Sequence, residues 1–167
     1  MIRLSFLPPE LGRWDGAEAE AVCVFVFDDQ RPPRGAAGLV DWRLCGRLSR
    51  WLQSGQLHGR RGERLLAPLH GRLPWKKLVV LGAGPQAAFD DVAYRACVRD
   101  ALRTLAGVGA RRYVLALPGR VEGHIAPRRA IEILREEGRP YDTEALVVEA
   151  AAAQKEMAEA ARHRSSS

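Results

Sequence analysis

The amino-acid sequence predicts a three-layer α/β/α fold around a mixed, mostly parallel sheet. The first observation is that residues 21–27 (AVCVFVF) and 76–84 (KKLVVLGAG) form nearly continuous apolar runs rich in β-branched side chains. Such runs are typical of strands that are buried on both faces, as in parallel sheets. The second observation is that strand patterns alternate with helical patterns through most of the chain, which is typical of α/β folds.

The first half of the chain predicts four strands and one helix. Residues 2–7 (IRLSFL) form a short strand pattern that stops at two prolines, because proline has no N–H to donate to a sheet. The strand at 21–27 leads into a predicted loop at 28–38. Residues 39–55 predict one amphipathic helix, with apolar residues at helical spacing on one side, arginines on the other and Gly55 at its end. Two strands follow, at 62–69 and 76–84.

The second half alternates helices and strands. Asp90 or Asp91 is placed to cap a helix that ends before Gly107. Proline is tolerated at the start of a helix and glycine is favoured just past its end, and the chain uses both. The remaining predicted elements are a strand at 111–118, a helix that starts at Pro127 and stops at Gly138, a strand at 144–149 and a helix at 151–162.

The composition is that of one globular domain. The chain has 167 residues, of which 47% are hydrophobic and 28% charged, and we place the domain at residues 1–164 with a disordered tail at 165–167. No apolar run approaches the ~20 residues of a membrane-spanning helix, and the N-terminus has no clear signal-peptide pattern. We expect a cytoplasmic protein without a membrane partner. The three cysteines show no metal-ligand spacing, so we expect buried, reduced thiols.

Several segments follow one another in a definite order. AEAVCVFVFDD is an apolar strand ending in acidic residues, and SGQLHGRRGE, LLAPL and VVLGAG come after it. In this order and spacing the chain resembles, over roughly residues 19–117, the N-terminal domain of leucyl aminopeptidases. That resemblance implies a fold similar to macro domains. Residues 117–134 (LPGRVEGHIAPRRAIEIL) also resemble a macro-domain stretch, in which a strand, a glycine loop and a proline-started helix follow one another.

The resemblance implies that the peptidase chemistry lies outside this segment. In that family a separate C-terminal domain holds two metal ions through a lysine, several aspartates and a glutamate, partly within an Asn-Thr-Asp-Ala-Glu-Gly run. This sequence contains no asparagine and so does not have that run, and a two-metal site needs several converging carboxylates. We therefore expect no catalytic residues, no metal, no cofactor and no enzymatic activity.

Three glycine segments are candidates for a phosphate site. In the resembled macro domains, ADP-ribose lies over the carboxyl ends of the strands, where glycine loops and helix N-termini hold its phosphates. Backbone N–H groups and the helix dipole favour an anion at such a place. The alternative is that the glycines only make tight strand-to-helix turns, and Glu122 would repel a phosphate if it pointed inward. The candidate ligand-binding residues are Arg34, Gly35, Gly38, Gly82, Gly84, Gly119, Arg120 and Gly123.

A second candidate site lies on the basic side of the helix predicted at 39–55. Exposed tryptophan and arginine are enriched at protein interfaces. Arginine faces also contact nucleic-acid phosphates, and the net charge of +6 permits this. However, the basic residues are spread along the chain, and no motif for sequence recognition is present. The candidate interface or nucleic-acid residues are Trp42, Arg43, Arg47 and Arg50.

These observations lead to one expectation and two alternatives. We expect a non-catalytic macro-like domain that acts through protein contacts, by self-association or by binding a partner, in an assembly or regulatory role. The first alternative is a module that binds a nucleotide or another phosphate ligand at the glycine segments. The second alternative is non-specific DNA binding through the arginines.

Overall fold

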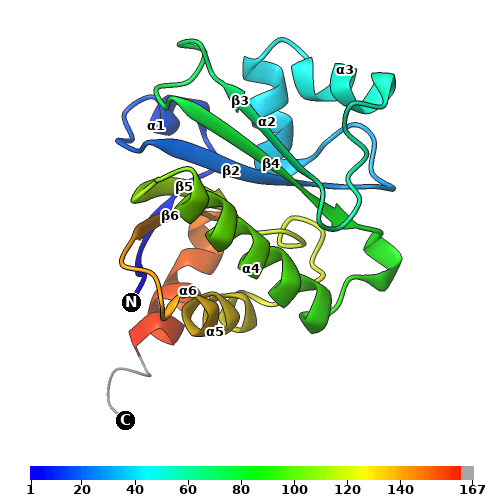
Figure 1. Cartoon of the computed structure of the whole chain (residues 1–167). Helices are drawn as coiled ribbons and strands as arrows, with labels where there is room; N and C mark the ends of the chain where they lie inside the picture. Colours follow the sequence, from blue (N-terminus) through cyan, green and yellow to red (C-terminus); the bar gives the residue numbers. More distant parts are fainter. Residues whose placement is uncertain (163–167) are drawn as a thin grey trace.

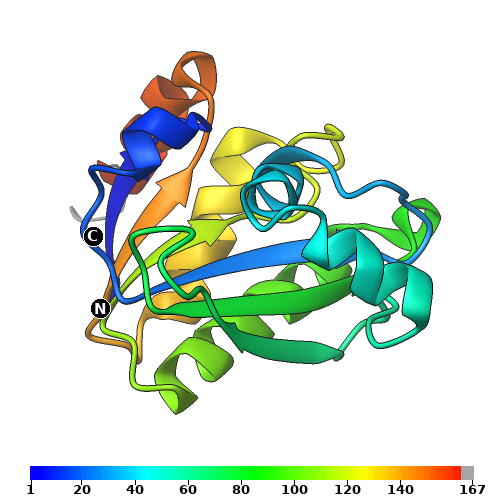
Figure 2. The ribbon, with the colours of Figure 1, turned by 90° about the horizontal axis from the view of Figure 1, so that it is seen from above.

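A six-stranded sheet with helices on both faces forms the body of the protein in the computed structural model, which describes residues 1–162 (Figure 1; Figure 2). The strand order is β1-β6-β5-β2-β4-β3, and every neighbouring pair is parallel except β3 with β4. The predicted three-layer, mostly parallel fold is therefore confirmed. The strands are β1 Arg3–Leu7, β2 Ala21–Phe27, β3 Arg64–Pro68, β4 Lys77–Gly84, β5 Arg112–Ala116 and β6 Glu144–Val148.

The helices cover the sheet as two separate layers. One layer is α1 Leu11–Trp14, α2 Gly35–Arg43 and α3 Arg47–Ser54. The other is α4 Asp91–Gly107, α5 Pro127–Gly138 and α6 Ala151–Arg162, with a short 3₁₀ turn, η1 Gln86–Ala88, before α4. Strand β2 explains the continuous apolar run in the sequence, because its alternate side chains enter the two different cores.

The helix predicted at 39–55 is wrong in its extent. Helix α2 begins earlier, at Gly35. The helical conformation is interrupted between α2 and α3, where Cys45 and Gly46 have φ values of 56° and 81°. Asp41 stabilises the break, since its carboxylate accepts hydrogen bonds from the Ser49 N–H (3.0 Å) and from the Ser49 hydroxyl (2.5 Å). The apolar side chains expected to face the core do so, although they come from two helices.

Two indole rings on the α2 side of the sheet are buried. Trp14 belongs to α1, a short helix that the sequence did not predict, and Trp75 belongs to the turn before β4. Both rings are almost fully buried, their centroids lie 5.7 Å apart, and each indole N–H donates to a backbone carbonyl at 2.9 Å. Both rings are therefore part of the core.

The expectation of three buried thiols holds for two cysteines and is wrong for the third. Cys23 and Cys97 are buried, and burial raises the pKa of Cys97 to about 12. Cys45 is exposed, because it sits in the break between α2 and α3 instead of inside a helix.

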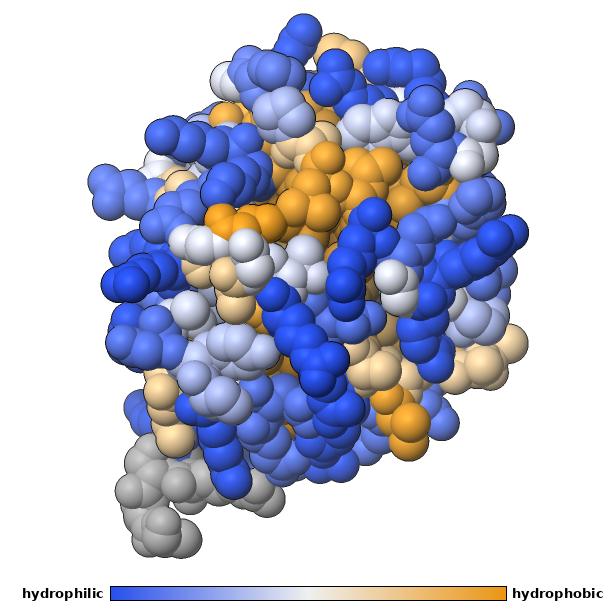
Figure 3. Space-filling view, viewed as in Figure 1, coloured by the Kyte–Doolittle hydropathy of each residue, from blue (hydrophilic) through white to orange (hydrophobic). Residues whose placement is uncertain are grey.

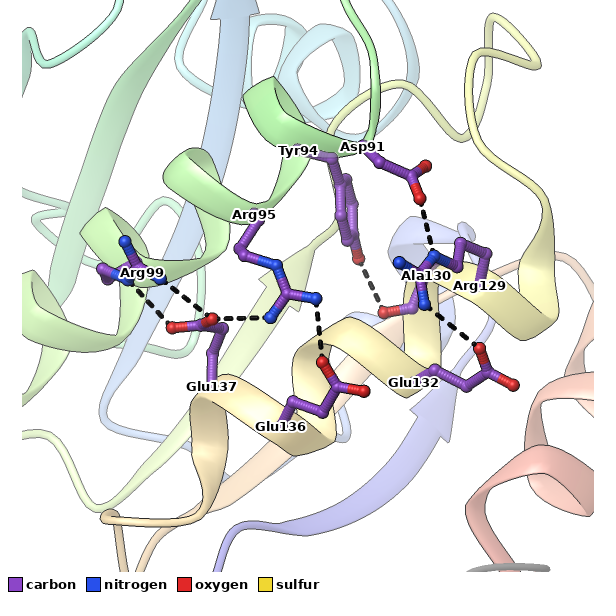
Figure 4. Close-up of polar contacts among 9 residues, drawn as sticks. All are labelled: Asp91, Tyr94, Arg95, Arg99, Arg129, Ala130, Glu132, Glu136 and Glu137. Carbon is purple, nitrogen blue, oxygen red and sulfur yellow. Dashed lines mark hydrogen bonds and ion pairs between the residues drawn. The ribbon is translucent and has the colours of Figure 1, made fainter.

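Ion pairs join α4 to α5 along their outer side (Figure 4). Arg95 contacts Glu137 at 2.8 Å, and Arg99 donates two hydrogen bonds to the same carboxylate at 2.9 and 3.1 Å. Arg129 contacts Asp91 at 2.6 Å near the start of both helices. The hydrogen bonds from Arg99 and Arg95 outweigh the effect of burial and lower the pKa of Glu137.

One buried hydroxyl also fixes the position of α5. Tyr94 of α4 is fully buried, and its hydroxyl donates to the Ala130 carbonyl in the first turns of α5 at 3.0 Å (Figure 4). Burial raises the pKa of Tyr94 well above its usual value. Helix α5 starts at Pro127, as predicted. Because Tyr94 holds the first turns of α5 against α4, it also fixes where the preceding loop ends.

None of the helices in residues 1–162 is long and apolar enough to cross a membrane. Within the same residues, no group of three histidine, cysteine, aspartate or glutamate side chains is placed to hold a metal ion. The disordered tail predicted at 165–167, and the last two residues of the domain predicted at 1–164, lie outside the described residues.

Candidate functional site

The N-terminus of α2 meets the loop between β5 and α5 at the carboxyl edge of the sheet. Gly35 opens α2 with a φ of 60°, and a Cβ atom at this position would lie 2.6 Å from Cγ2 of Val121. A Cβ atom at Gly38, one turn later, would lie 2.8 Å from the carbonyl oxygen of Pro33. These two glycines therefore allow two loops to pack directly on α2.

Very little space remains between these segments. Arg34, Gly35 and Gly119 line a cavity of about 30 Å³ together with Phe27 and Glu122. A single water needs roughly 10–15 Å³ of such space, and ligand pockets usually measure about 300–1,000 Å³. The cavity accommodates a water molecule or two and is too small for a nucleoside diphosphate.

Arg120, a candidate for anion contact, is paired within the protein. Its Nε lies 2.8 Å from the Glu149 carboxylate, and a terminal nitrogen donates to the Ile125 carbonyl at 2.5 Å. Only 12% of the Arg120 side chain and 9% of the Glu149 side chain are exposed. A glutamate that follows β6 therefore neutralises the arginine that follows β5.

Glu122 points toward the small cavity. It lines the cavity wall, and its carboxylate accepts a hydrogen bond from the Gln30 amide at 3.0 Å. A carboxylate in this position disfavours an anion, as the sequence led us to expect if Glu122 pointed inward.

The third glycine segment lies apart from the other two. Gly84 donates its backbone N–H to the Gly59 carbonyl at 2.8 Å, and Gly82 packs so closely under Arg60 that a side chain there would overlap its carbonyl. Glu63 fixes this loop by accepting the N–H groups of His58 (2.7 Å) and Gly59 (2.8 Å). The cavity lining includes neither Gly82 nor Gly84.

The remaining candidate glycines, Gly119 and Gly123, have different surroundings. Both have φ values near 75°, a backbone conformation that favours glycine. A Cβ atom on Gly119 would lie 2.6 Å from Cε1 of Phe89, whereas a Cβ atom on Gly123 would meet nothing within 4 Å. Gly119 is needed for close packing, and Gly123 for a turn.

A larger cleft lies beside the small cavity. Its volume is about 300 Å³, which is near the lower limit for ligand pockets. It opens between the start of α2 and the end of β6, and its lining residues include Pro9, Ala36, Arg120, Val148 and Ala150.

The second candidate site surrounds Trp42. The Trp42 side chain is 73% exposed on α2, although most other large hydrophobic side chains in the described chain are buried. It stands in a depression of about 740 Å³, which we call the Trp42 groove. The residues that line the groove are Pro32, Pro33, Gly38, Asp41, Trp42, Arg43, Cys45, Gly46 and Arg72.

The three arginines predicted to accompany Trp42 have different roles. Arg43 pairs with Asp15 through two hydrogen bonds of 2.7 and 3.2 Å, and this contact lowers the pKa of Asp15. The Arg47 guanidinium lies 6.0 Å from the centre of the Trp51 ring, at the limit of a cation–π contact. Arg50 donates to the Cys45 carbonyl at 2.7 Å, next to the groove. Trp42 and Arg43 therefore line the groove, Arg50 contacts its edge from α3, and Arg47 lies against Trp51 within α3.

Another apolar region lies on the opposite side of the sheet. Figure 3 shows hydrophobic residues gathered over β3 and β4, above α4. Leu66 of β3 is 52% exposed there, because β3 is the edge strand and α4 packs on β4 and β2. Arg64 and Asp100 form an ion pair of 3.1 Å that bridges part of this region.

Sequence reasoning missed two residues that shape these sites. Arg72 belongs to a turn and reaches the Trp42 groove, where it contacts Cys45 Sγ at 3.7 Å. Glu149 follows β6 and forms an ion pair with Arg120. The only available signal was that Glu149 follows an apolar strand directly, as residues at the functional edge of a parallel sheet often do. No local pattern indicates the position of Arg72.

The comparison with protein families decides the relationship. The family described as "Cytosol aminopeptidase family, N-terminal domain" matches residues 23–137. The chain belongs to the cytosol aminopeptidase N-terminal domain family. The resemblance seen over residues 19–117 is thereby confirmed, and the match extends into α5.

Individual members of the cytosol aminopeptidase family match at moderate identity. A probable cytosol aminopeptidase of Ralstonia nicotianae is 30% identical over 126 residues, which cover 73% of this chain and 25% of that protein. A probable cytosol aminopeptidase of Halorhodospira halophila is 32% identical over 105 residues, which cover 62% of this chain and 21% of that protein. The chain thus spans about a quarter or less of the length of these relatives.

Solved structures show the same fold at low identity. A tomato leucine aminopeptidase variant matches with a TM-score of 0.61 and 13% identity, covering 95% of this chain and 35% of that one. A Trypanosoma brucei macrodomain in complex with ADP has a TM-score of 0.69 and 14% identity, covering 95% and 68%. The macrodomain of Thermus aquaticus DarG has a TM-score of 0.66 and 14% identity, covering 89% and 98%. This member of the aminopeptidase N-terminal domain family therefore has a macrodomain-like fold.

Proposed function

We propose that this protein is a non-catalytic interaction module, in which the fold of an aminopeptidase N-terminal domain presents a surface for a protein partner. The observation that carries the proposal is the exposure of Trp42 inside the Trp42 groove. A tryptophan that leaves 73% of its side chain in water forgoes a large part of its hydrophobic stabilisation. Tryptophan is also among the residues that contribute most to binding energy in protein interfaces.

The carboxyl edge of the sheet supports the same conclusion by its own packing. Val121 packs against Gly35, Glu149 pairs with Arg120, and Glu122 lines the cavity between them. Arg120 and the glycine that opens α2 are thus engaged within the chain. An assembly or regulatory role in the cytoplasm fits such a module, and the match to the N-terminal domain alone fits a chain without peptidase activity.

The test is an affinity purification with three forms of the tagged chain: wild type, Trp42→Ala and Val92→Ala. Val92 is 74% exposed on α4, in the other helix layer, so its variant is a matched surface control. We expect a protein, or further copies of the chain itself, to be retained by the wild type and by Val92→Ala and to be lost with Trp42→Ala. Identical retention by all three forms would contradict the proposal, and so would release of leucine from a leucyl substrate with zinc or manganese.

A second candidate function is binding of a nucleotide in the cleft of about 300 Å³. The observation that favours it is the position of this cleft at the carboxyl ends of β5 and β6, where ligands bind in open α/β sheets. Its test is a thermal shift with ADP or ADP-ribose on the wild type and on Ala150→Trp, which would fill the mouth of the cleft. A shift that only the wild type shows would favour the nucleotide, and equal melting temperatures with and without ligand would exclude it.

A further inference from the structure

The floor of the Trp42 groove is suited to bind one apolar side chain. Gly38 and Trp42 lie four residues apart on α2 and therefore on the same face of the helix. The Pro33 carbonyl occupies the place of a Gly38 side chain, so the Pro33 backbone and Gly38 together form this floor. Trp42 lies beside the floor and is 73% exposed. An apolar side chain placed beside Pro33 would lie against the Trp42 ring.

Arg72 lines the Trp42 groove, and Arg50 lies next to it, outside the lining. Arg72 contacts Cys45 Sγ at 3.7 Å, and Arg50 donates to the Cys45 carbonyl at 2.7 Å. Neither guanidinium forms an ion pair with any carboxylate in residues 1–162. A guanidinium binds a carboxylate well through paired hydrogen bonds.

The carboxylates near the groove are already bound within the chain. Asp15 pairs with Arg43, and both oxygens of Asp41 accept hydrogen bonds from Ser49. The Arg43–Asp15 pair carries no net charge, and the guanidiniums of Arg50 and Arg72 outnumber the Asp41 carboxylate, so the net charge around the groove is positive. Complementary charge suppresses wrong partners and speeds association with the right one.

A protein ligand fits this surface better than a nucleic acid. Single-stranded nucleic acids bind on several successive aromatic rings along a basic groove, but Trp42 is the only aromatic residue that lines this one. An apolar seat beside two separate guanidiniums instead matches one hydrophobic side chain flanked by aspartates or glutamates.

We propose that the Trp42 groove binds an acidic peptide segment of a partner protein, with an apolar side chain between Pro33 and Trp42 and carboxylates on Arg50 and Arg72. This inference rests on the proposed function and adds the chemistry of the partner to it. It requires that affinity depends both on the indole ring and on the two guanidiniums.

The test is a selection of short random peptides on the immobilised full-length chain at about 0.1 M salt, followed by affinity measurement on four proteins. The proteins are the wild type, Trp42→Ala, the double variant Arg50→Gln/Arg72→Gln, and the control Arg103→Gln/Arg128→Gln. Arg103 and Arg128 are exposed arginines on α4 and α5, so the control removes the same charge from the other helix layer. All substituted side chains are exposed, and circular dichroism checks that each variant is folded.

We expect the selected peptides to be acidic and to carry an apolar residue. Affinity should fall about 30-fold or more with Trp42→Ala, as is typical of a tryptophan that is a hot spot of its interface. It should fall about tenfold with Arg50→Gln/Arg72→Gln and less than about twofold with the control. Raising the salt to about 1 M should weaken binding to the wild type, because salt screens exposed charges.

The outcomes separate this inference from the proposed function. Peptides of neutral composition that depend on Trp42 but not on Arg50 and Arg72 would overturn the inference and leave the proposed function standing. Peptides that bind all four proteins equally, or no selected peptides at all, would overturn the inference, and identical retention by the wild type and Trp42→Ala in the affinity purification would overturn the proposed function as well. An oligothymidylate that binds more tightly than any peptide, and that loses affinity with Trp42→Ala, would replace the acidic peptide by a nucleic acid.

Discussion

The buried ion pair between Arg120 and Glu149 gives the sharpest prediction about stability, tested with Glu149→Gln. Glutamine has the shape of glutamate and its amide oxygen can still accept from the Arg120 Nε, so the substitution removes charge while preserving packing. It leaves a guanidinium whose side chain is only 12% exposed without a counter-charge. Breaking a buried pair in this way typically costs about 3–5 kcal/mol. Because Arg120 keeps the Ile125 carbonyl as an acceptor, we expect a loss near the lower end, about 3 kcal/mol.

Urea unfolding followed by tryptophan fluorescence measures this loss. With an m-value of about 2 kcal/mol per molar urea, the midpoint should fall by about 1.5 M. For a chain of this size the melting temperature should fall by about 6–12 °C. Asp142→Asn is the control, since Asp142 pairs with Arg3 but both side chains are largely exposed, and its urea midpoint should stay close to that of the wild type.

A double-mutant cycle distinguishes the charge effect from simple loss of packing. Arg120→Met combined with Glu149→Leu replaces the pair by apolar side chains of similar volume, an exchange that is often neutral. We expect this double variant to be only about 1 kcal/mol less stable than the wild type, because the Ile125 carbonyl loses its donor. Additive losses from the two single substitutions, or a Glu149→Gln variant as stable as the wild type, would refute the reasoning.

Three further predictions concern the packing of α4, α5 and the glycine loop. Glu137→Gln should cost about 1–2 kcal/mol at neutral pH, because Arg95 and Arg99 both lose a charged acceptor. The folded protein holds the pKa of Glu137 below that of the unfolded chain, so this contribution is present above about pH 4.3 and is lost as the pH falls through the lower folded pKa. In urea titrations, the difference in stability between wild type and variant should therefore be smaller near pH 3 than at neutral pH. A difference that does not change with pH would contradict the argument. Tyr94→Phe should cost about 1–2 kcal/mol, because the Ala130 carbonyl loses its buried donor; an unchanged urea midpoint would show that the hydroxyl does not fix α5. Gly119→Ala should cost about 2–4 kcal/mol, since strain at φ 76° adds to a contact of 2.6 Å with Phe89, whereas Gly123→Ala, with free space around it, should cost about 1–2 kcal/mol in the same assay; equal costs would mean that the Phe89 contact is unimportant.

The sequence predicted the order of strands and major helices because those signals are local. Alternate side chains of β2 enter both cores, and the resulting apolar run is readable without any knowledge of its neighbours. The helix cap at Asp90 is equally local, and its side chain accepts the Ala93 N–H at 2.8 Å, as expected. The break at Cys45 and Gly46 escaped prediction because the apolar spacing continues across it, while the residues that stabilise it, Asp41 and Ser49, are not a distinctive pattern.

The sequence identified part of the two candidate sites, because only certain residue types are suited to bind a phosphate or to contact a protein partner. Glycines after strands with an arginine beside them are typical of phosphate sites. A tryptophan on the basic side of a helix is typical of protein interfaces. The sequence could not show that Arg120 would meet Glu149, or that Arg72 would reach the groove from a distant turn.

By itself, the sequence determined the fold class, the family and the types of residue available at the edge of the sheet. Only the tertiary structure decided whether those residues face a ligand or each other. Gln30 and Glu122 are 92 positions apart, and Arg120 and Glu149 are 29 apart, yet each pair is in hydrogen-bond contact. Such contacts depend on how parallel strands bring distant loops to one edge, and short-range periodicity carries no information about the distances between those loops.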